Sequence, residues 1–310
     1  MTENKEVQST ALKNILEGLM RRYSQRVPDV STIISAMTKA GIIQKAEDIE
    51  NDHIAFRTLS VPNLGIASFE KIFLNVGYQK RDYYHFEQKK LNAYWYSPPI
   101  NTEKGLDNLP RIFISELIVD DLSLEAQRII KKYTQSVAKD PVDDLDLNNG
   151  MAVDEFLHSP LWATPTIEDY KTLLAESEYA AWVIYNRYYL NHFTISVHNL
   201  PKGYNTIQEF NAFLENIGIK LNNSGGVIKQ SPDGGLLQSS TVAQMVEAEF
   251  AGGIKEKIAG SYVEFAERKV LQAYSHLPEN EILRKHRRDG FEAGNADKIF
   301  ESTFSSQTGR

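Results

Sequence analysis

The chain has 310 residues, of which 42% are hydrophobic and 24% are charged, so it can bury one large core or two smaller ones. Its formal net charge of −7 gives no broad basic field, which argues against a nucleic-acid partner or an acidic membrane surface. The sequence has no cysteine, which excludes disulfides, thiolate metal sites and a cysteine nucleophile, and leaves histidine and carboxylate side chains as metal ligands.

Apolar residues at helical spacing predict two N-terminal helices, over residues 12–23 and 30–42. Strand-like runs and one helix-like run follow in the order strand, helix, strand, strand, strand, over residues 53–59, 68–76, 78–86, 92–97 and 111–119. This order predicts a first βαβββ module over residues 46–122, after a helical lead-in over residues 1–45.

A helical block broken by three prolines predicts an insertion over residues 123–190. The earlier order then returns, with a strand, a helix, a hairpin and a closing strand over residues 192–197, 206–217, 225–230, 235–241 and 261–270. A second βαβββ module is therefore expected over residues 191–270, followed by a C-terminal segment over residues 271–310. The predicted fold class is α+β, with the two modules forming one catalytic unit and with substantial helical additions.

Side chains alternate between the two faces of a strand, so His53 and Arg57 share one face of the first strand. The same rule puts polar residues on one face of two strands in the second module, namely His192, Thr194 and Ser196 in its first strand and Tyr262 and Glu264 in its last. If both sheets curl around one cavity, His53, His192 and Glu264 meet there.

Two neutral imidazoles and one carboxylate are the ligand set of non-haem Fe(II) oxygenases. Each of the three residues also has an ordinary structural interpretation, because a strand histidine is commonly a hydrogen-bonded core residue and a lone glutamate is commonly an edge charge. The repeat favours the metal site, since both imidazoles occupy the first strand of matching modules and the carboxylate lies in a closing strand.

Three segments of the sequence resemble the 2-oxoadipate dioxygenase/decarboxylase family of the vicinal-oxygen-chelate superfamily, which is built from βαβββ modules. They are Asp52 to Thr58, Asn191 to Thr194 and Asn295 to Ser302. The resemblance implies that His53, His192 and Glu264 bind Fe(II), with another divalent metal as the occupant in some purified samples, and that Arg57 holds the substrate carboxylate. The strand that contains Glu264 is also similar to the ligand strand of the 4-hydroxyphenylpyruvate dioxygenases, which favours Glu264 over Glu267.

The resemblance further implies the reaction of an iron-dependent 2-oxo acid dioxygenase, in which 2-oxoadipate and O2 give 2-hydroxyglutarate and CO2 as part of lysine catabolism. Arg57 suits a carboxylate because a guanidinium offers two parallel donors. In that family the C-terminal segment covers the site. The loop at Asn295 is therefore a candidate donor to the second carboxylate of the substrate, with a helix cap or turn as its alternative role.

Two other functions remain open from the sequence. Glu116 occupies in the first module the place that Glu264 holds in the second, and as a fourth ligand it would indicate a glyoxalase-type isomerase or lyase that uses zinc or nickel. A non-catalytic member of the superfamily would only bind a small molecule. Among the remaining histidines, His198 is the best candidate to support a ligand through a hydrogen bond.

The cellular location is expected to be the cytoplasm. The N-terminus lacks the apolar centre of a secretory signal peptide, and no later run reaches the roughly 20 apolar residues of a membrane-spanning helix. We therefore expect a soluble protein whose partners are a small 2-oxo acid and O2, with no nucleic acid and no membrane. The sequence does not indicate the oligomeric state.

Overall fold

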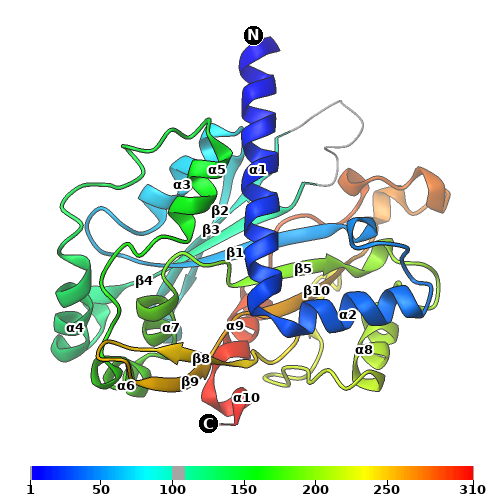
Figure 1. Ribbon diagram of the computed structural model, residues 1–310. Coiled ribbons are helices and arrows are strands. Elements are labelled where there is room, and N and C mark those ends of the chain that lie inside the picture. Colours follow the sequence, from blue (N-terminus) through cyan, green and yellow to red (C-terminus); the bar gives the residue numbers. More distant parts are fainter. Residues whose placement is uncertain (1, 100–108, 310) are drawn as a thin grey trace. The chain divides into compact units, whose positions relative to one another are not determined.

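The computed structural model describes residues 2–99 and 109–309 (Figure 1). The chain divides into two compact units, each assembled from three separate segments. The first unit contains Met1–Arg26, Ile54–Asn191 and Met245–Gly260, and the second contains Val27–His53, His192–Gln244 and Ser261–Arg310. The module boundaries expected from the sequence describe a different division, and they stay a prediction.

The elements follow one another along the chain in an order close to the expected one. The α-helices are α1 (Thr2–Arg26), α2 (Pro28–Lys39), α3 (Ile66–Asn75), α4 (Leu124–Thr134), α5 (Gly150–Leu157), α6 (Ile167–Glu176), α7 (Glu178–Asn186), α8 (Ile207–Asn216), α9 (Ala293–Phe300) and α10 (Ser305–Thr308). The strands are β1 (Asn51–Leu59), β2 (Gln79–Phe86), β3 (Leu91–Ser97), β4 (Arg111–Leu117), β5 (His192–Ser196), β6 (Lys229–Gln230), β7 (Leu236–Ser240), β8 (Met245–Glu249), β9 (Lys255–Ala259) and β10 (Tyr262–Arg268).

The first unit contains the predicted first βαβββ arrangement. Its strands have the order β2-β3-β4-β1, and β3 pairs antiparallel with both β2 and β4. Helix α3 packs on β1 through Phe69 and Phe73, whose ring centroids lie 4.7 and 5.7 Å from that of Phe56. Because Phe56 faces the helix, alternation along the strand places Arg57 on the opposite face of β1.

The second unit repeats this arrangement. Its strands have the order β6-β7-β10-β5, in which β10 runs parallel to β5 and antiparallel to β7. Helix α8 packs on β10 through Phe210, whose ring centroid lies 5.3 Å from that of Phe265. Glu264 therefore lies on the face of β10 turned away from α8. The predicted α+β fold with two βαβββ units is confirmed.

The expected hairpin in the second unit is also confirmed. Strands β6 and β7 flank a turn at Ser231 to Gly235, in which Gly234 has a φ of +68°, a left-handed conformation that glycine adopts without strain. The Ser231 hydroxyl accepts a hydrogen bond from the Leu236 backbone N–H at 2.9 Å. This turn fixes the register of β7, the strand next to β10.

Two elements differ from the expectation. The first unit contains an antiparallel hairpin of β8 and β9 that the sequence pattern did not predict (Figure 1, gold). The segment around Asn295 was predicted to be a loop, but it belongs to helix α9, so that prediction is wrong. Across residues 2–99 and 109–309, no helix combines the length and the apolar character needed to cross a bilayer.

Candidate metal centre

The second unit brings together the three side chains that the sequence marked as metal ligands. The Glu264 carboxylate lies 3.4 Å from His53 Nε2 and 3.0 Å from His192 Nε2, and the two imidazole nitrogens are 3.4 Å apart. All three residues are buried, with at most 5% of their surface exposed. Among the residues that the structure describes, this is the one cluster of histidine and acidic side chains arranged to hold an ion.

The spacing of these atoms suits a divalent cation. Ligand atoms about 2.1 Å from an ion lie about 3.0 Å apart when their bonds meet at right angles and about 3.4 Å apart at the tetrahedral angle. The observed separations of 3.0 to 3.4 Å span this range, so the cluster can close around one ion without movement of its strands. The spacing alone favours neither geometry, whereas the donor set of two imidazoles and one carboxylate is that of non-haem Fe(II) sites.

The electrostatics of the cluster favour ionised Glu264. Burial on its own raises the pKa of the Glu264 carboxyl, but the neighbouring His53 and His192 imidazoles outweigh burial and hold the pKa well below its usual range. Burial on its own lowers the pKa of His53, and the Glu264 and Asp52 carboxylates outweigh it, so the net pKa of His53 is raised. The site therefore offers a negative charge to an incoming cation.

A second carboxylate lies behind His53. The Asp52 Oδ1 atom is 2.8 Å from His53 Nδ1, the ring nitrogen that points away from the cluster. Arg268 donates from Nε to Asp52 Oδ2 at 2.6 Å and from Nη2 to Asp52 Oδ1 at 2.8 Å. Its remaining nitrogen, Nη1, donates to the Gly290 and Arg288 carbonyls at 2.7 and 3.2 Å. Asp52 and Arg268 are both almost fully buried.

A chain of amides fixes the Glu264 carboxylate. Gln238 on β7 donates from Nε2 to Glu264 Oε1 at 2.6 Å, and its own Oε1 accepts from Asn295 Nδ2 at 2.9 Å. The same Asn295 nitrogen lies 3.3 Å from the carbonyls of Lys229 and Leu236. The Asn295 amide thus connects helix α9 to the carboxylate through Gln238, and its proposed contact with substrate stays a prediction.

The walls of the cluster combine one hydroxyl with aromatic rings. The Thr194 hydroxyl oxygen lies 3.1 Å from His53 Nε2, next to the position that an ion would take. The Phe291 ring meets the His53 ring edge-on with centroids 4.8 Å apart, and the Tyr262 ring lies 4.8 Å from that of His192. The apolar rings restrict the orientation of both imidazoles and limit the access of water.

Arg57 lies in the first unit with aromatic neighbours. Its guanidinium carbon is 5.1 Å from the ring centroid of Tyr179 and 5.2 Å from that of Trp182, and the residue is only 1% exposed. A charged side chain is rarely buried to this extent without a specific role. Its role as a carboxylate donor stays a prediction.

Two other glutamates considered from the sequence have structural partners. Glu116 Oε2 accepts a hydrogen bond from the Ile66 backbone N–H at 2.9 Å, at the start of α3. Glu267 Oε2 accepts from the Ile207 N–H at 2.8 Å, at the start of α8, and its other oxygen pairs with Lys269. Neither belongs to the cluster described above. Glu116 therefore gives the glyoxalase-type alternative no support.

His198, which the sequence marked as a supporting residue, lies close to this network. Its Nδ1 atom accepts a hydrogen bond from the Arg268 backbone N–H at 3.2 Å. Burial lowers the pKa of His198 to about 3, so the ring is neutral at physiological pH. His198 thus supports the strand that contains Glu264 and Arg268.

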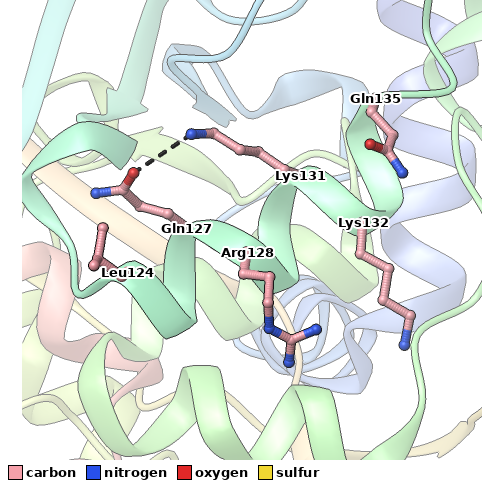
Figure 2. Close-up of a pocket in the computed structure, with 6 residues that line it drawn as sticks. All are labelled: Leu124, Gln127, Arg128, Lys131, Lys132 and Gln135. Carbon is pink, nitrogen blue, oxygen red and sulfur yellow. Dashed lines mark hydrogen bonds between the residues drawn. The ribbon is translucent and has the colours of Figure 1, made fainter.

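A hollow on the surface of the first unit differs in its chemistry from the candidate metal centre. It runs along α4 and is lined by Leu124, Gln127, Arg128, Lys131, Lys132 and Gln135 (Figure 2). Two of its cationic groups form ion pairs, Arg128 with Glu125 and Lys132 with Asp169, and Lys131 donates to Gln127 Oε1 at 3.5 Å. With no carboxylate or imidazole in its lining, this hollow offers none of the usual metal ligands.

Sequence reasoning missed three residues of the centre, namely Asp52, Arg268 and Gln238, as partners of the proposed ligands. Two signals could have found them. Asp52 directly precedes His53, and Arg268 has the same parity as Glu264 on one strand, so it faces the same side. Gln238 becomes a neighbour of Glu264 only because β7 pairs with β10, which no local pattern reveals.

The sequence is similar to proteins of known activity. The family model described as 2-oxoadipate dioxygenase/decarboxylase matches residues 15–281. The chloroplastic 2-oxoadipate dioxygenase/decarboxylase of Arabidopsis thaliana is 42% identical over 319 residues, which cover 100% of this chain and 82% of that protein. The chloroplastic/amyloplastic protein of the same name from Oryza sativa subsp. japonica is 44% identical, over 96% of this chain and 80% of that protein.

Two solved structures are similar as well. The crystal structure of the hydroxyglutarate synthase from Oryza sativa, in complex with 2-oxoadipate, has a TM-score of 0.88 at 42% identity and covers 98% of this chain and 95% of that one. A glyoxalase-superfamily protein from Ralstonia eutropha JMP134 has a TM-score of 0.69 at 20% identity, over 93% of this chain and 87% of that one. The second likeness concerns the fold alone, and it agrees with the βαβββ architecture.

The comparison corrects one prediction. The expected cytoplasmic location is wrong, because both curated relatives are plastid proteins. The physical reason is that the sequence features that suggested the cytoplasm are also compatible with a plastid. A lack of cysteine does not distinguish the cytoplasm from a plastid, and plastid targeting segments are amphipathic and rich in Arg and Ser, so a search for an apolar signal cannot detect them.

Proposed function

Because the chain belongs to the 2-oxoadipate dioxygenase/decarboxylase family, we propose that it converts 2-oxoadipate and O2 into 2-hydroxyglutarate and CO2 at an Fe(II) ion bound by His53, His192 and Glu264. The observation that carries the proposal is the meeting of these three side chains in one buried cluster, although they come from distant parts of the sequence. A role in lysine catabolism would follow from this substrate.

The donor set determines the chemistry that the site can support. When bound, Fe(II) would supply open coordination positions to the 2-oxo acid and to O2, because three protein ligands leave about three of six positions vacant. The negative Glu264 carboxylate would partly neutralise a bound cation, and the two imidazoles would hold it as neutral ligands. The Phe291 and Tyr262 rings pack against the imidazoles, and both histidines are buried, so the protein side of the site offers little room for water.

Arg57 is the proposed donor to a carboxylate of the substrate. Its guanidinium can form two parallel charge-assisted hydrogen bonds, which orient a planar carboxylate better than a lysine can. The Tyr179 and Trp182 rings hold this guanidinium in a defined place within the first unit. A pre-ordered donor loses little conformational entropy when substrate binds.

The proposed reaction balances without a separate reductant. The carboxylate next to the keto group leaves as CO2, which supplies two electrons for the reduction of O2. One oxygen atom completes the new carboxylate. The other is inserted into a C–H bond of the remaining five-carbon chain, which becomes C–OH and supplies the other two electrons. The remote carboxylate of the substrate is unchanged.

The test is oxygen uptake by protein freed of metal and then reloaded with Fe(II) without air. We expect consumption of O2 that requires both Fe(II) and 2-oxoadipate, with one CO2 and one 2-hydroxyglutarate formed per O2. His53→Ala should abolish turnover. Turnover in the absence of O2 would favour a glyoxalase-type reaction instead, and tight binding of 2-oxoadipate without any product would favour a non-catalytic binding protein.

A variant of Arg57 adds a check on substrate binding. Arg57→Lys keeps the positive charge and loses the paired donors, each of which contributes about 1.5–3 kcal/mol when it binds a charged group. We expect KM for 2-oxoadipate to rise by about 10- to 100-fold while the affinity for Fe(II) is unchanged. An unchanged KM would refute the assigned role of Arg57 and leave the metal centre intact.

A further inference from the structure

The buried ion pair behind His53 has a geometry suited to more than stability. We propose that Asp52 and Arg268 are positioning residues that set the orientation of the His53 imidazole and thereby the affinity of the centre for its metal. The inference rests on the proposed metal site, and it concerns residues that lie outside the ligand set.

Asp52 determines which nitrogen of His53 is available. A carboxylate can only accept, so the 2.8 Å contact between Asp52 Oδ1 and His53 Nδ1 requires the proton on Nδ1. In the neutral ring that binds a metal, the lone pair then belongs to Nε2, which is the atom that faces Glu264 and His192. Such a carboxylate partner also makes the imidazole a stronger ligand and fixes the plane of its ring.

Arg268 in turn fixes Asp52. Its Nε and Nη2 atoms donate to the two oxygens of the carboxylate, a paired geometry that holds the plane of the Asp52 group. Its Nη1 atom is held by the Gly290 and Arg288 carbonyls. Both ends of the guanidinium are therefore anchored, and Asp52 cannot turn away from His53 without losing these contacts.

The placement of Arg268 on β10 joins the two sides of the site. Glu264 and Arg268 are four residues apart on one strand, so alternation places them on the same face. One rigid element thus supplies a ligand directly and orients a second ligand through Asp52. The Phe291 ring packs against both Arg268 and His53. Its centroid lies 5.7 Å from the Arg268 guanidinium carbon and 4.8 Å from the centroid of the His53 ring.

Stability alone does not account for this ion pair. Removing two charges from water costs about as much as their attraction returns, so a buried pair adds little compared with apolar residues of the same volume. A pair in this place is better explained by the orientation that it gives to a ligand.

The experiment measures Co(II) binding, by competition with a chromophoric chelator at fixed pH, together with the visible spectrum of bound Co(II) and the melting temperature of the metal-free protein. In Asp52→Asn we expect the dissociation constant for Co(II) to rise by about 10- to 100-fold and the absorption bands of bound Co(II) to shift. Because this variant leaves the Arg268 charge buried without its partner, the double variant Asp52→Asn/Arg268→Gln, which carries neither charge, is measured beside it. Arg268→Lys, which keeps the charge and loses the paired geometry, should give an intermediate effect.

The matched control is Asp154→Asn in the first unit, where Asp154 is a buried carboxylate paired with Arg21 and Arg22. It should lower the melting temperature without changing Co(II) affinity. Folded Asp52 variants with unchanged affinity and spectrum would overturn the inference, and so would an equal loss of affinity in Asp154→Asn. Failure of the unmodified protein to bind Co(II) would instead refute the metal centre itself, and the inference with it.

Discussion

Glu264 and Glu267 lie three residues apart on β10 and have opposite surroundings. Glu264 lies with His53 and His192, whereas Glu267 accepts a hydrogen bond at the start of α8. Both residues are buried, so burial does not tell them apart. Alternation along the strand does, because neighbours an odd number apart face opposite sides.

The pair provides an internally controlled test at the level of single residues. Glu264→Gln removes the charged ligand, so Fe(II) or Co(II) affinity should fall by more than the roughly 100-fold that loss of a supporting hydrogen bond causes, and turnover should disappear. Glu267→Gln keeps an oxygen that can accept from the Ile207 N–H, and its stability should change by less than about 1 kcal/mol. Metal titration and urea unfolding of both variants check these outcomes. Equal metal affinity in the two variants would contradict the assignment of Glu264.

The proposed ligands were named from the sequence, but the residues that form hydrogen bonds with them were missed. Parity and the repeated order of elements gave His53, His192 and Glu264 a defined face and module, and the family resemblance assigned them as ligands and favoured Glu264 over Glu267. Asp52 directly precedes His53, but its hydrogen bond to that ring depends on a side-chain rotamer. The contact of Gln238 with Glu264 depends on the pairing of β7 with β10 and has no local signature. The same limit applies to Asn295, whose amide is engaged by Gln238.

At the level of elements, helix α9 is connected to the proposed metal centre through one chain of amide side chains. Asn295 donates to Gln238, and Gln238 donates to Glu264. A second anchor follows α9 at Ser302, whose hydroxyl accepts from the Asn222 amide at 3.0 Å and lies 2.8 Å from the Ser240 hydroxyl. Both anchors are buried, but only the first one reaches a proposed ligand.

The two anchors can be separated by substitution. Asn295→Ala and Ser302→Ala should each cost about 1–3 kcal/mol of stability, because each leaves buried polar atoms without partners. Only Asn295→Ala should also weaken metal binding, by about 10- to 100-fold, since Gln238 then loses its support. Denaturant unfolding and metal titration measure the two effects. If Asn295 instead binds substrate directly, its removal will raise KM for 2-oxoadipate and leave metal affinity unchanged.

Most elements were predictable, and the exceptions have physical reasons. The strands of both modules contain runs of β-branched and aromatic residues bounded by turn residues, which is a specific signal. The β8–β9 hairpin was missed because β9 begins Lys-Glu-Lys, with little apolar character. Its turn did carry a signal, since Gly252 and Gly253 both adopt positive φ and adjacent glycines are typical of hairpin turns.

At the level of the whole molecule, the half-buried His198 makes stability depend on pH. Burial lowers the pKa of His198 to about 3, with the Asp52 carboxylate opposing the shift and Arg287 and Arg268 adding to it. An unfolded histidine has a pKa of about 6.5, so between these values the unfolded chain binds more protons than the folded one. Stability from this group is therefore complete above about pH 6.5 and is lost as the pH falls toward 3.

Replacement of this ring tests the effect. In His198→Asn the amide oxygen can still accept from the Arg268 N–H, and no group titrates. We expect the loss of stability between pH 6.5 and 5 to be shallower than in the unmodified protein, by up to about 1.4 kcal/mol per pH unit. Urea unfolding of metal-free protein at several pH values measures this slope, with the exposed His276→Asn as the control. Identical slopes in all three proteins would show that His198 does not titrate on unfolding.

The second unit draws its ligands from three segments that are far apart in the sequence, and this has a consequence for biosynthesis. Glu264 is added to the growing chain 211 residues after His53 (264 − 53). A growing chain therefore lacks the complete set of proposed ligands until Glu264 has been added, and unfolded segments bind metals weakly. We therefore expect the proposed Fe(II) to bind only after these segments have folded together, so the metal content of the protein in a cell should depend on the free iron available to the folded second unit.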